Sequence, residues 1–169
     1  MAVGGGAVYV GGSRRPDAGG RPALFLVKYT RSGLRAWQRS YTTVRGATQL
    51  ALGPSERIYL AGERVMADGT WQVGVVCYAK TGARLWSRAV GHARRHDFIE
   101  ELRAGRNGIC GTGQYSGAQG LEEGLVFRMR LNGAVQYVTS IPTPQSEGVW
   151  CTTCAMDALG RVSVGGTFS

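Results

Sequence analysis

The stretch that decides the fold is RIYLAGERVMADGTWQVGVVCYAKTGARLWSR, which runs from Arg57 to Arg88. Its opening run, Ile58–Glu63, has counterparts at Val8–Ser13, Ile109–Gln114 and Val162–Thr167, about fifty residues apart. Its closing run, Val75–Arg88, has counterparts at Leu26–Arg39 and Val126–Thr139. Two separate markers that keep one register indicate an internal repeat, and a period near fifty residues is typical of propellers and solenoids.

The pattern within each unit favours strands over helices. Runs such as Arg57–Gly62, Val73–Ala79 and Arg84–Val90 are rich in Val, Ile, Tyr and Trp and end at glycine or polar turns. No window keeps the apolar spacing of an amphipathic helix. We therefore expect an all-β chain, a β-propeller built from four-stranded antiparallel blades.

The strand count predicts a partial or open propeller of about three and a half blades within one segment, residues 1–169. The expected repeats cover approximately 1–46, 47–96, 97–148 and 149–169. Propellers close with four to eight blades. The chain is therefore expected to be part of a larger propeller, or to close by pairing with a copy of itself as a homo-oligomer.

Charge and hydropathy restrict the classes of partner. The formal net charge is +9, and every basic residue except Lys28 and Lys80 is arginine. The arginines are dispersed and no aromatic stacking motif accompanies them, which speaks against nucleic acid as the partner. No apolar run is long enough for a transmembrane helix, and no signal peptide is recognised at the start.

Connection lengths alternate along the chain and predict where binding residues lie. Short turns such as Lys80–Gly82 alternate with longer connections at 13–22, 41–47, 63–71, 91–96, 114–123 and 142–147. In up-and-down sheets, alternate connections lie at opposite ends, and loops on a rigid scaffold carry most binding residues. The predicted binding residues on the long-loop face are Arg14, Arg15, Arg64, Trp71, His92, Arg94, Arg95 and His96.

Catalytic and metal chemistry finds little support in the residue pattern. Cys151 and Cys154 have the spacing of redox and zinc motifs, but on a strand they would point to opposite faces. His92 and His96 share a face only on a helix. We expect structural cysteines, no metal, no cofactor and no catalytic residue. Asp157 is expected to hold the turn that follows it, while Trp37, Trp86 and Tyr137 are expected to pack between blades.

Three stretches resemble the bacterial-type β-propeller repeat family: Ala23–Arg39, Leu50–Glu63 and Ala155–Thr167. The resemblance implies a propeller and an extracellular or cell-envelope location. Tyr78–Trp86 is also similar to the tryptophan-docking motif of pyrroloquinoline-quinone propellers, matching it at Thr81, Gly82 and Trp86. Val76 and Tyr78 replace that motif's Ala and Asp, so kinship of fold is expected without the quinone.

The function expected from these patterns is a non-catalytic propeller module for binding or scaffolding, with a protein or glycan ligand on the long-loop face. One alternative is part of a propeller enzyme, either a quinoprotein-like oxidoreductase or a hydrolase. The other is a basic surface that binds nucleic acid or acidic partners.

Overall fold

The computed structural model describes residues 1–14, 23–116, 122–142 and 148–168, without the side chains of Arg45, Ala47 and Thr48. These residues form strands and a single 3₁₀ turn, η1 (Pro54–Glu56), which confirms the all-β expectation. Among them, no helix is long and apolar enough to cross a membrane.

The described strands form four antiparallel sheets, in which each strand pairs with the next along the chain. The first sheet contains β1 (Ala2–Gly4), β2 (Ala7–Arg14), β3 (Ala23–Thr30) and β4 (Arg35–Tyr41). The second contains β5 (Arg45–Leu52), β6 (Ile58–Val65), β7 (Trp71–Tyr78) and β8 (Arg84–Val90). The third contains β9 (Asp97–Gly105), β10 (Gly108–Ser116), β11 (Glu122–Met129) and β12 (Val135–Ile141). The fourth contains β13 (Val149–Met156) and β14 (Val162–Phe168).

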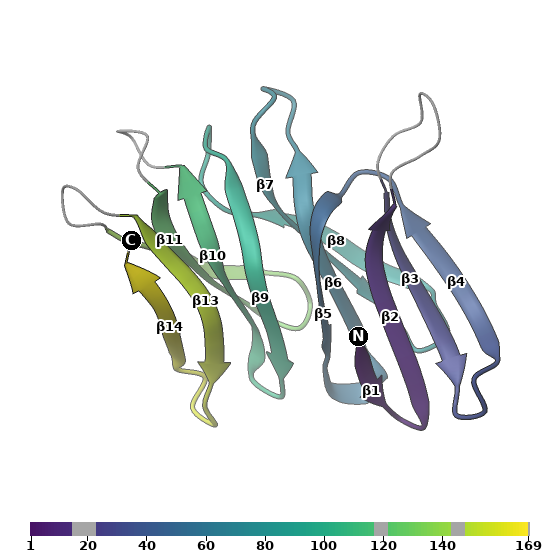
Figure 1. The fold of residues 1–169 in the computed structure, drawn as a ribbon. Coiled ribbons are helices and arrows are strands. Elements are labelled where there is room, and N and C mark those ends of the chain that lie inside the picture. Colours follow the sequence, from purple (N-terminus) through teal and green to yellow (C-terminus); the bar gives the residue numbers. More distant parts are fainter. Residues whose placement is uncertain (15–22, 117–121, 143–147, 169) are drawn as a thin grey trace.

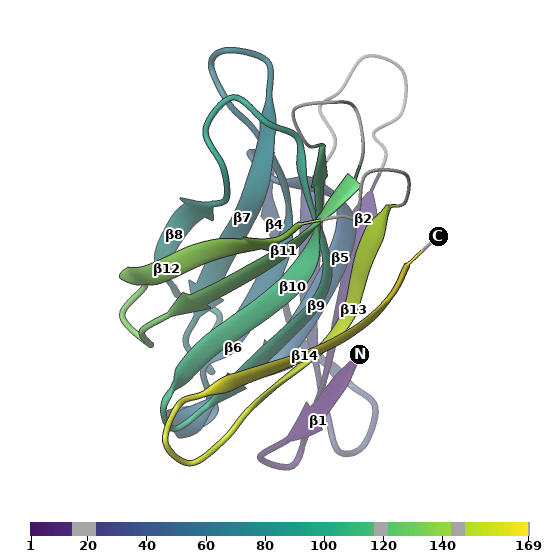
Figure 2. The same cartoon turned by 90° about the vertical axis from the view of Figure 1, so that its left-hand side faces the viewer.

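The sheets follow one another in an open row, and each packs its face against the next (Figure 1). The first strands β1, β5, β9 and β13 lie next to one another along one side of this row. The later strands extend away from them with a strong twist, which the view in Figure 2 shows. The outer strands β4, β8 and β12 therefore lie on the side opposite the first strands.

Two hydrophobic cores fill the spaces on either side of the second sheet. Ile58 and Leu60 of β6 point towards the first sheet and pack in one core with Leu24 and Leu26. Tyr59 and Ala61 point the other way into a core shared with the third sheet. This explains the continuous apolar run of β6: both of its faces are buried, so its residues need not alternate with polar ones.

Five hairpins share one design. In each, the first residue donates its N–H to the carbonyl of the fifth, and a glycine at the fourth position donates back to the first. The glycines have φ between 78° and 89°, as required in a three-residue hairpin loop with a glycine bulge. The five hairpins cover residues 30–34, 66–70, 79–83, 130–134 and 157–161.

Two connections at the upper end are shorter than the sequence predicts. Because β6 continues to Val65, the predicted loop at 63–71 is reduced to the hairpin at 66–70. The connection between β4 and β5 spans only residues 42–44. The segment 91–96 keeps its predicted length. The loops predicted at 13–22, 114–123 and 142–147 fall largely on residues 15–22, 117–121 and 143–147, which lie outside the described residues. The strand ends that these connections join gather at the upper end in Figure 1.

Candidate functional site in the cleft between the first two sheets

Each of two tryptophans fixes its own sheet to the hairpin of the next. Trp37 on β4 donates its Nε1–H to the carbonyl oxygen of Lys80 at 3.2 Å. Trp86 on β8 donates in the same way to Leu131, also at 3.2 Å. The packing between sheets expected of these two residues is confirmed. Tyr137 on β12 differs, because 38% of its surface remains exposed.

Hairpin glycines let the indole rings approach this closely. A Cβ atom placed on Gly82 would lie 3.0 Å from Trp37, and one on Gly133 would lie 3.0 Å from Trp86. Both glycines also have positive φ, 83° and 89°. Glycine thus allows both the positive φ of the turn and the close approach of the neighbouring indole ring. We call the two contact regions the first joint, around Trp37 and Gly82, and the second joint, around Trp86 and Gly133.

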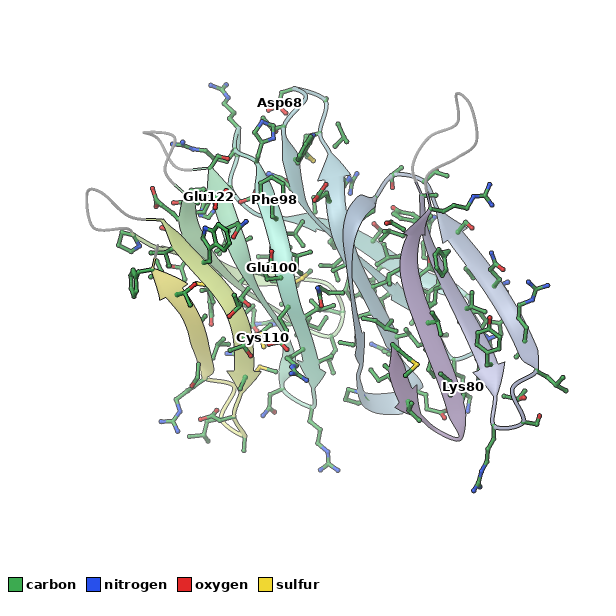
Figure 3. The ribbon with its side chains drawn as sticks, viewed as in Figure 1. Asp68, Lys80, Phe98, Glu100, Cys110 and Glu122 are labelled. Carbon is green, nitrogen blue, oxygen red and sulfur yellow. The ribbon has the colours of Figure 1, made fainter. Side chains whose placement is uncertain are left out.

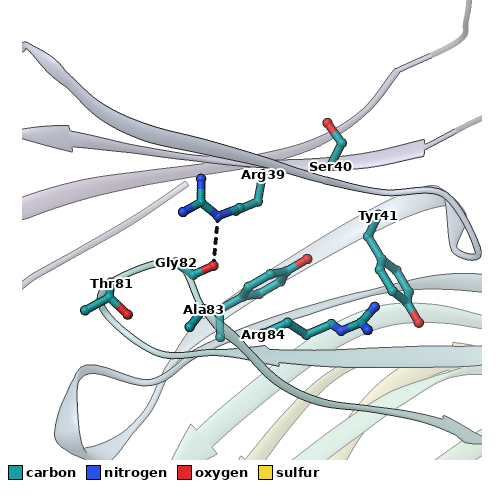
Figure 4. Close-up of a pocket in the computed structure, with 8 residues that line it drawn as sticks. Arg39, Ser40, Tyr41, Thr81, Gly82, Ala83 and Arg84 are labelled. Carbon is teal, nitrogen blue, oxygen red and sulfur yellow. Dashed lines mark hydrogen bonds between the residues drawn. The ribbon is translucent and has the colours of Figure 1, made fainter.

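The first joint opens into a cleft of 480 Å³ on the side of the outer strands (Figure 4). β4 forms one wall, and the hairpin between β7 and β8 forms the other. The lining residues are Arg39, Ser40, Tyr41, Tyr78, Thr81, Gly82, Ala83 and Arg84. An exposed arginine stands on each wall, which gives the cleft a positive charge.

Backbone and aromatic contacts hold the two arginines in place. Arg39 donates its Nε–H to the carbonyl oxygen of Gly82 at 2.9 Å (Figure 4). The guanidinium of Arg84 lies 5.2 Å from the ring centre of Tyr41, a cation–π arrangement. Within the described part of the chain, neither arginine forms an ion pair with an aspartate or a glutamate. Their charge is therefore available to a ligand.

Tyr41 adds a polar group whose ionisation responds to these arginines. Its hydroxyl donates to Ser87 Oγ at 2.8 Å. Burial raises the pKa of Tyr41, but hydrogen bonds with Ser87 and Thr43 and the charges of Arg84 and Arg64 outweigh this effect and lower it. The cleft thus favours negative charge even on one of its own side chains.

The residues predicted from the sequence lie at the upper end and are not among those that line this cleft. Arg14 and Arg64 are on β2 and β6, Trp71 begins β7, and His92, Arg94, Arg95 and His96 belong to the segment 91–96. Arg15 lies outside the described residues. Trp71 and His96 meet edge to face with ring centres 5.0 Å apart, and Phe98 packs on the same indole at 5.7 Å.

His92 is tied to the third sheet by several contacts. Asp97, fully buried, lies 3.1 Å from His92 Nδ1 and accepts the backbone N–H of His92 at 2.9 Å. Burial raises the pKa of Asp97, although the bonds from His92 oppose this. The imidazole also stacks on Tyr115, with ring centres 4.1 Å apart. These contacts anchor the segment 91–96 and leave His92 only partly exposed.

Acidic residues offset the arginines of the upper end. Arg95 donates to the carbonyl oxygen of Ser116 at 3.3 Å, whereas Arg94 is exposed. Asp68 and Glu122 lie at the same end (Figure 3). The upper end therefore has a mixed charge, whereas the described residues that line the cleft of the first joint include two arginines and no carboxylate.

Arg39, Arg84 and Tyr41 were not predicted from the sequence, because they lie on strands and not in the long loops. A usable signal was present: Arg35, Arg84 and Val135 each stand two residues after a hairpin glycine. Each of the three also pairs with the end of the preceding strand, opposite Tyr29, Tyr78 and Met129 respectively. At this position, the first two repeats have arginine and the third has valine.

Comparison with known proteins assigns no role to these residues. No protein-family model matches the chain, and a search of curated proteins finds no similar sequence. Within the described ranges, no three His, Cys, Asp or Glu side chains gather closely enough to hold a metal ion.

Proposed function

We propose that this chain is a non-catalytic module of β-propeller type that binds an acidic segment of a protein partner in the cleft of the first joint. The observation that carries the proposal is the pair Arg39 and Arg84, which face one cleft from two sheets without a carboxylate partner among the described residues. Carboxylates are the groups that the planar guanidinium binds with paired hydrogen bonds.

The proposal of a propeller is supported by how the sheets are joined. Four-stranded sheets pack face to face with their first strands adjacent, as blades would in a propeller. An outer-strand tryptophan bonded to the next hairpin repeats the same joint at residues 37 and 86. A scaffold of this kind holds two adjacent outer strands at a fixed separation, so the cleft between them is preorganised.

Preorganisation matters because a single exposed ion pair contributes only about 0 to 1 kcal/mol. A ligand with several carboxylates can engage Arg39 and Arg84 together. Since Arg39 is already held by Gly82 and Arg84 by Tyr41, less side-chain freedom is lost when the ligand binds. An acidic peptide satisfies this requirement better than a ligand with one charge.

The test is calorimetric titration of the chain with an oligoglutamate peptide at low ionic strength. Arg84→Glu places a negative charge in the cleft and is expected to weaken binding at least about tenfold, or roughly 1.4 kcal/mol. Arg88→Glu is the matched control, because Arg88 lies on the same strand, is exposed, and does not line the cleft. Its effect is expected to remain within about twofold, the size of a long-range charge effect.

Other outcomes would contradict the proposal. Equal weakening by both variants would show that the net charge of +9 binds the peptide without a defined site. Tight binding of duplex DNA or heparin by both variants, lost at moderate salt, would instead favour a delocalised basic surface. An unchanged affinity in Arg84→Glu would exclude the cleft as the binding site.

A further inference from the structure

Two buried cysteines from different sheets meet between the third and fourth sheets. Cys110 lies on β10 and Cys154 on β13, and their Sγ atoms are 3.5 Å apart. Cys110 is fully buried and Cys154 is 4% exposed. Cys110 is marked on the third sheet in Figure 3. The fold thus brings together two thiols that are far apart in the sequence.

A bulge in β13 points Cys154 towards the third sheet. The register of β13 against β14 shifts between Cys151 and Thr153, so one residue is unpaired and the alternation of side chains is interrupted. Both Cys151 and Cys154 are consequently buried, with 2% and 4% exposure. The expectation that the two would point to opposite faces was wrong, because a regular strand was assumed.

Glu101 on β9 holds the strand segment around Cys154. Its Oε2 accepts the backbone N–H of Cys154 at 2.6 Å and the hydroxyl of Thr153 at 2.8 Å. Arg103 in turn pairs with Glu101 Oε1 at 2.6 Å. These bonds fix the backbone of β13 opposite β10, so the distance between the two sulfur atoms is constrained by the fold.

A cleft of 440 Å³ leads to one of the two sulfur-bearing residues. It lies between β9 and β13 and is lined by Arg103, Ala104, Gly105, Thr153, Cys154, Ala155 and Met156. Cys110 does not line it. Because the cleft reaches Cys154 and not Cys110, we assign the first contact with hydrogen peroxide to Cys154.

We propose that Cys110 and Cys154 are a redox pair that a peroxide converts into a disulfide between the third and fourth sheets. In the first step, the sulfur of Cys154 attacks one oxygen of hydrogen peroxide. The O–O bond breaks, a sulfenic acid forms and one water leaves. In the second step, the Cys110 thiolate attacks the sulfenic sulfur, the S–S bond forms and the S–O bond breaks. The departing hydroxide takes up the proton that the Cys110 thiol released when it ionised, and leaves as a second water.

The electrostatics of the pair suits Cys110 to the second step, in which it attacks the sulfenic sulfur. The neighbouring Cys154 thiol stabilises the thiolate of Cys110, and this lowers the pKa of Cys110 despite burial. The pKa of Cys154 is raised by Cys110 and by burial. The resolving thiol is therefore the better nucleophile, while the first step is slower than at an exposed thiolate.

Bond formation requires only a local movement. The sulfur atoms must approach from 3.5 Å to about 2.05 Å, which rotation of the two side chains can supply. The bond closes the chain between residues 110 and 154, and such a closure restricts the unfolded state. The oxidised protein is thus expected to have the higher melting temperature, and the reduced one to allow more movement between the two sheets.

The experiment treats the folded full chain with hydrogen peroxide, blocks remaining thiols with an alkylating agent, and maps the peptides by mass spectrometry without reduction. The expected product lacks two hydrogen atoms, contains a peptide in which Cys110 is joined to Cys154, and melts at a higher temperature. Dithiothreitol should restore the original mass and melting temperature. Cys151→Ala and Cys77→Ala should leave the product unchanged, whereas Cys110→Ala should leave Cys154 as a sulfenic or sulfinic acid.

The peptide map of the oxidised wild-type protein tests the proposal even if a variant fails to fold. A bond between Cys151 and Cys154, a bond between two chains, or four alkylated thiols after treatment would each overturn the proposal. An oxidised chain with the expected bond but an unchanged melting temperature would overturn its role in joining the two sheets.

Discussion

The first and second joints share a framework of one tryptophan and one hairpin glycine but differ in the side chains around it. Both have a tryptophan bonded to a hairpin carbonyl and packed over a glycine. Where the first joint has Tyr41, Tyr78 and Arg84, the corresponding positions of the second have Val90, Met129 and Val135. Val90 and Met129 are buried within the core between the second and third sheets. Tyr78 of the first joint is likewise buried, in the core between the first and second sheets. The first joint differs in that it also opens into a cleft with two arginines.

The difference shows which part of the repeat is constrained by the fold. Tryptophan and glycine remain where backbone geometry requires them, whereas the residues around them change freely between polar and apolar. A ligand-binding role can therefore develop at one joint without disturbing the other. The predictions below separate the shared framework from the variable residues.

The largest effect is expected from removing the indole of the second joint. Trp86→Ala should lower the free energy of unfolding by about 3 kcal/mol, because the cavity lies beside a closed core. Trp37→Ala should cost about 2 kcal/mol, since water can enter through the cleft and fill part of the space. Urea unfolding monitored by circular dichroism measures both. Equal losses would show that the two joints are packed alike.

An intermediate effect is expected at the hairpin glycines. Gly69, with φ of 82° and no atom near its added Cβ, reports only the conformational cost of alanine, about 1 kcal/mol. Gly133→Ala also forces Trp86 to move, so its cost should reach about 2 kcal/mol. Chemical denaturation of the two variants gives the comparison. If Gly69→Ala costs as much as Gly133→Ala, the ring contact contributes nothing.

A small effect on stability with a large effect on binding is expected when the first joint is made to resemble the second. Arg84→Val should change the free energy of unfolding by no more than about 0.5 kcal/mol, as at other exposed positions. Binding of oligoglutamate should nevertheless fall at least about tenfold. The two quantities are measured by denaturation and calorimetry. A loss of stability as large as that of Trp37→Ala would show that Arg84 is part of the framework.

The smallest effect concerns the ionisation of Tyr41. Arg84 is one of the groups that lower its pKa, so Arg84→Val should raise that pKa. A tyrosine whose pKa is lowered by folding stabilises the folded state at alkaline pH, above its unfolded value of about 10. This contribution is lost as the pH falls through the folded-state pKa. Tyrosinate absorbance during a pH titration, compared with that of Tyr41→Phe, isolates the signal.

The sequence predicted the strands well because their pattern is local. The middle unit was expected to have strands at 57–62, 73–79 and 84–90, and the structure has β6, β7 and β8 at nearly these bounds. Asp157 holds its turn as expected, since its Oδ1 accepts the backbone N–H groups of Leu159 and Arg161. Each of these features depends on residues close together in the chain.

The cleft and the cysteine pair could not be predicted from local patterns in the sequence. Arg39 and Arg84 line one cleft only because two sheets are packed together, and Cys110 contacts Cys154 only because β13 contains a bulge. Neither the packing distance nor the bulge has a local signal in the sequence. The sequence did indicate a group of binding residues in the predicted long loops. In the structure, however, His92 and Trp71 of this group contact neighbouring side chains.

The most direct test of the proposed function is to locate a bound acidic peptide. The measurement is the change in backbone amide chemical shifts as oligoglutamate is added to the isotope-labelled chain. We expect the largest changes at Thr81, Gly82 and Ala83, together with the side-chain Nε–H signal of Arg39. Changes concentrated in residues 91–96, or spread evenly over all exposed arginines, would contradict binding in the cleft of the first joint.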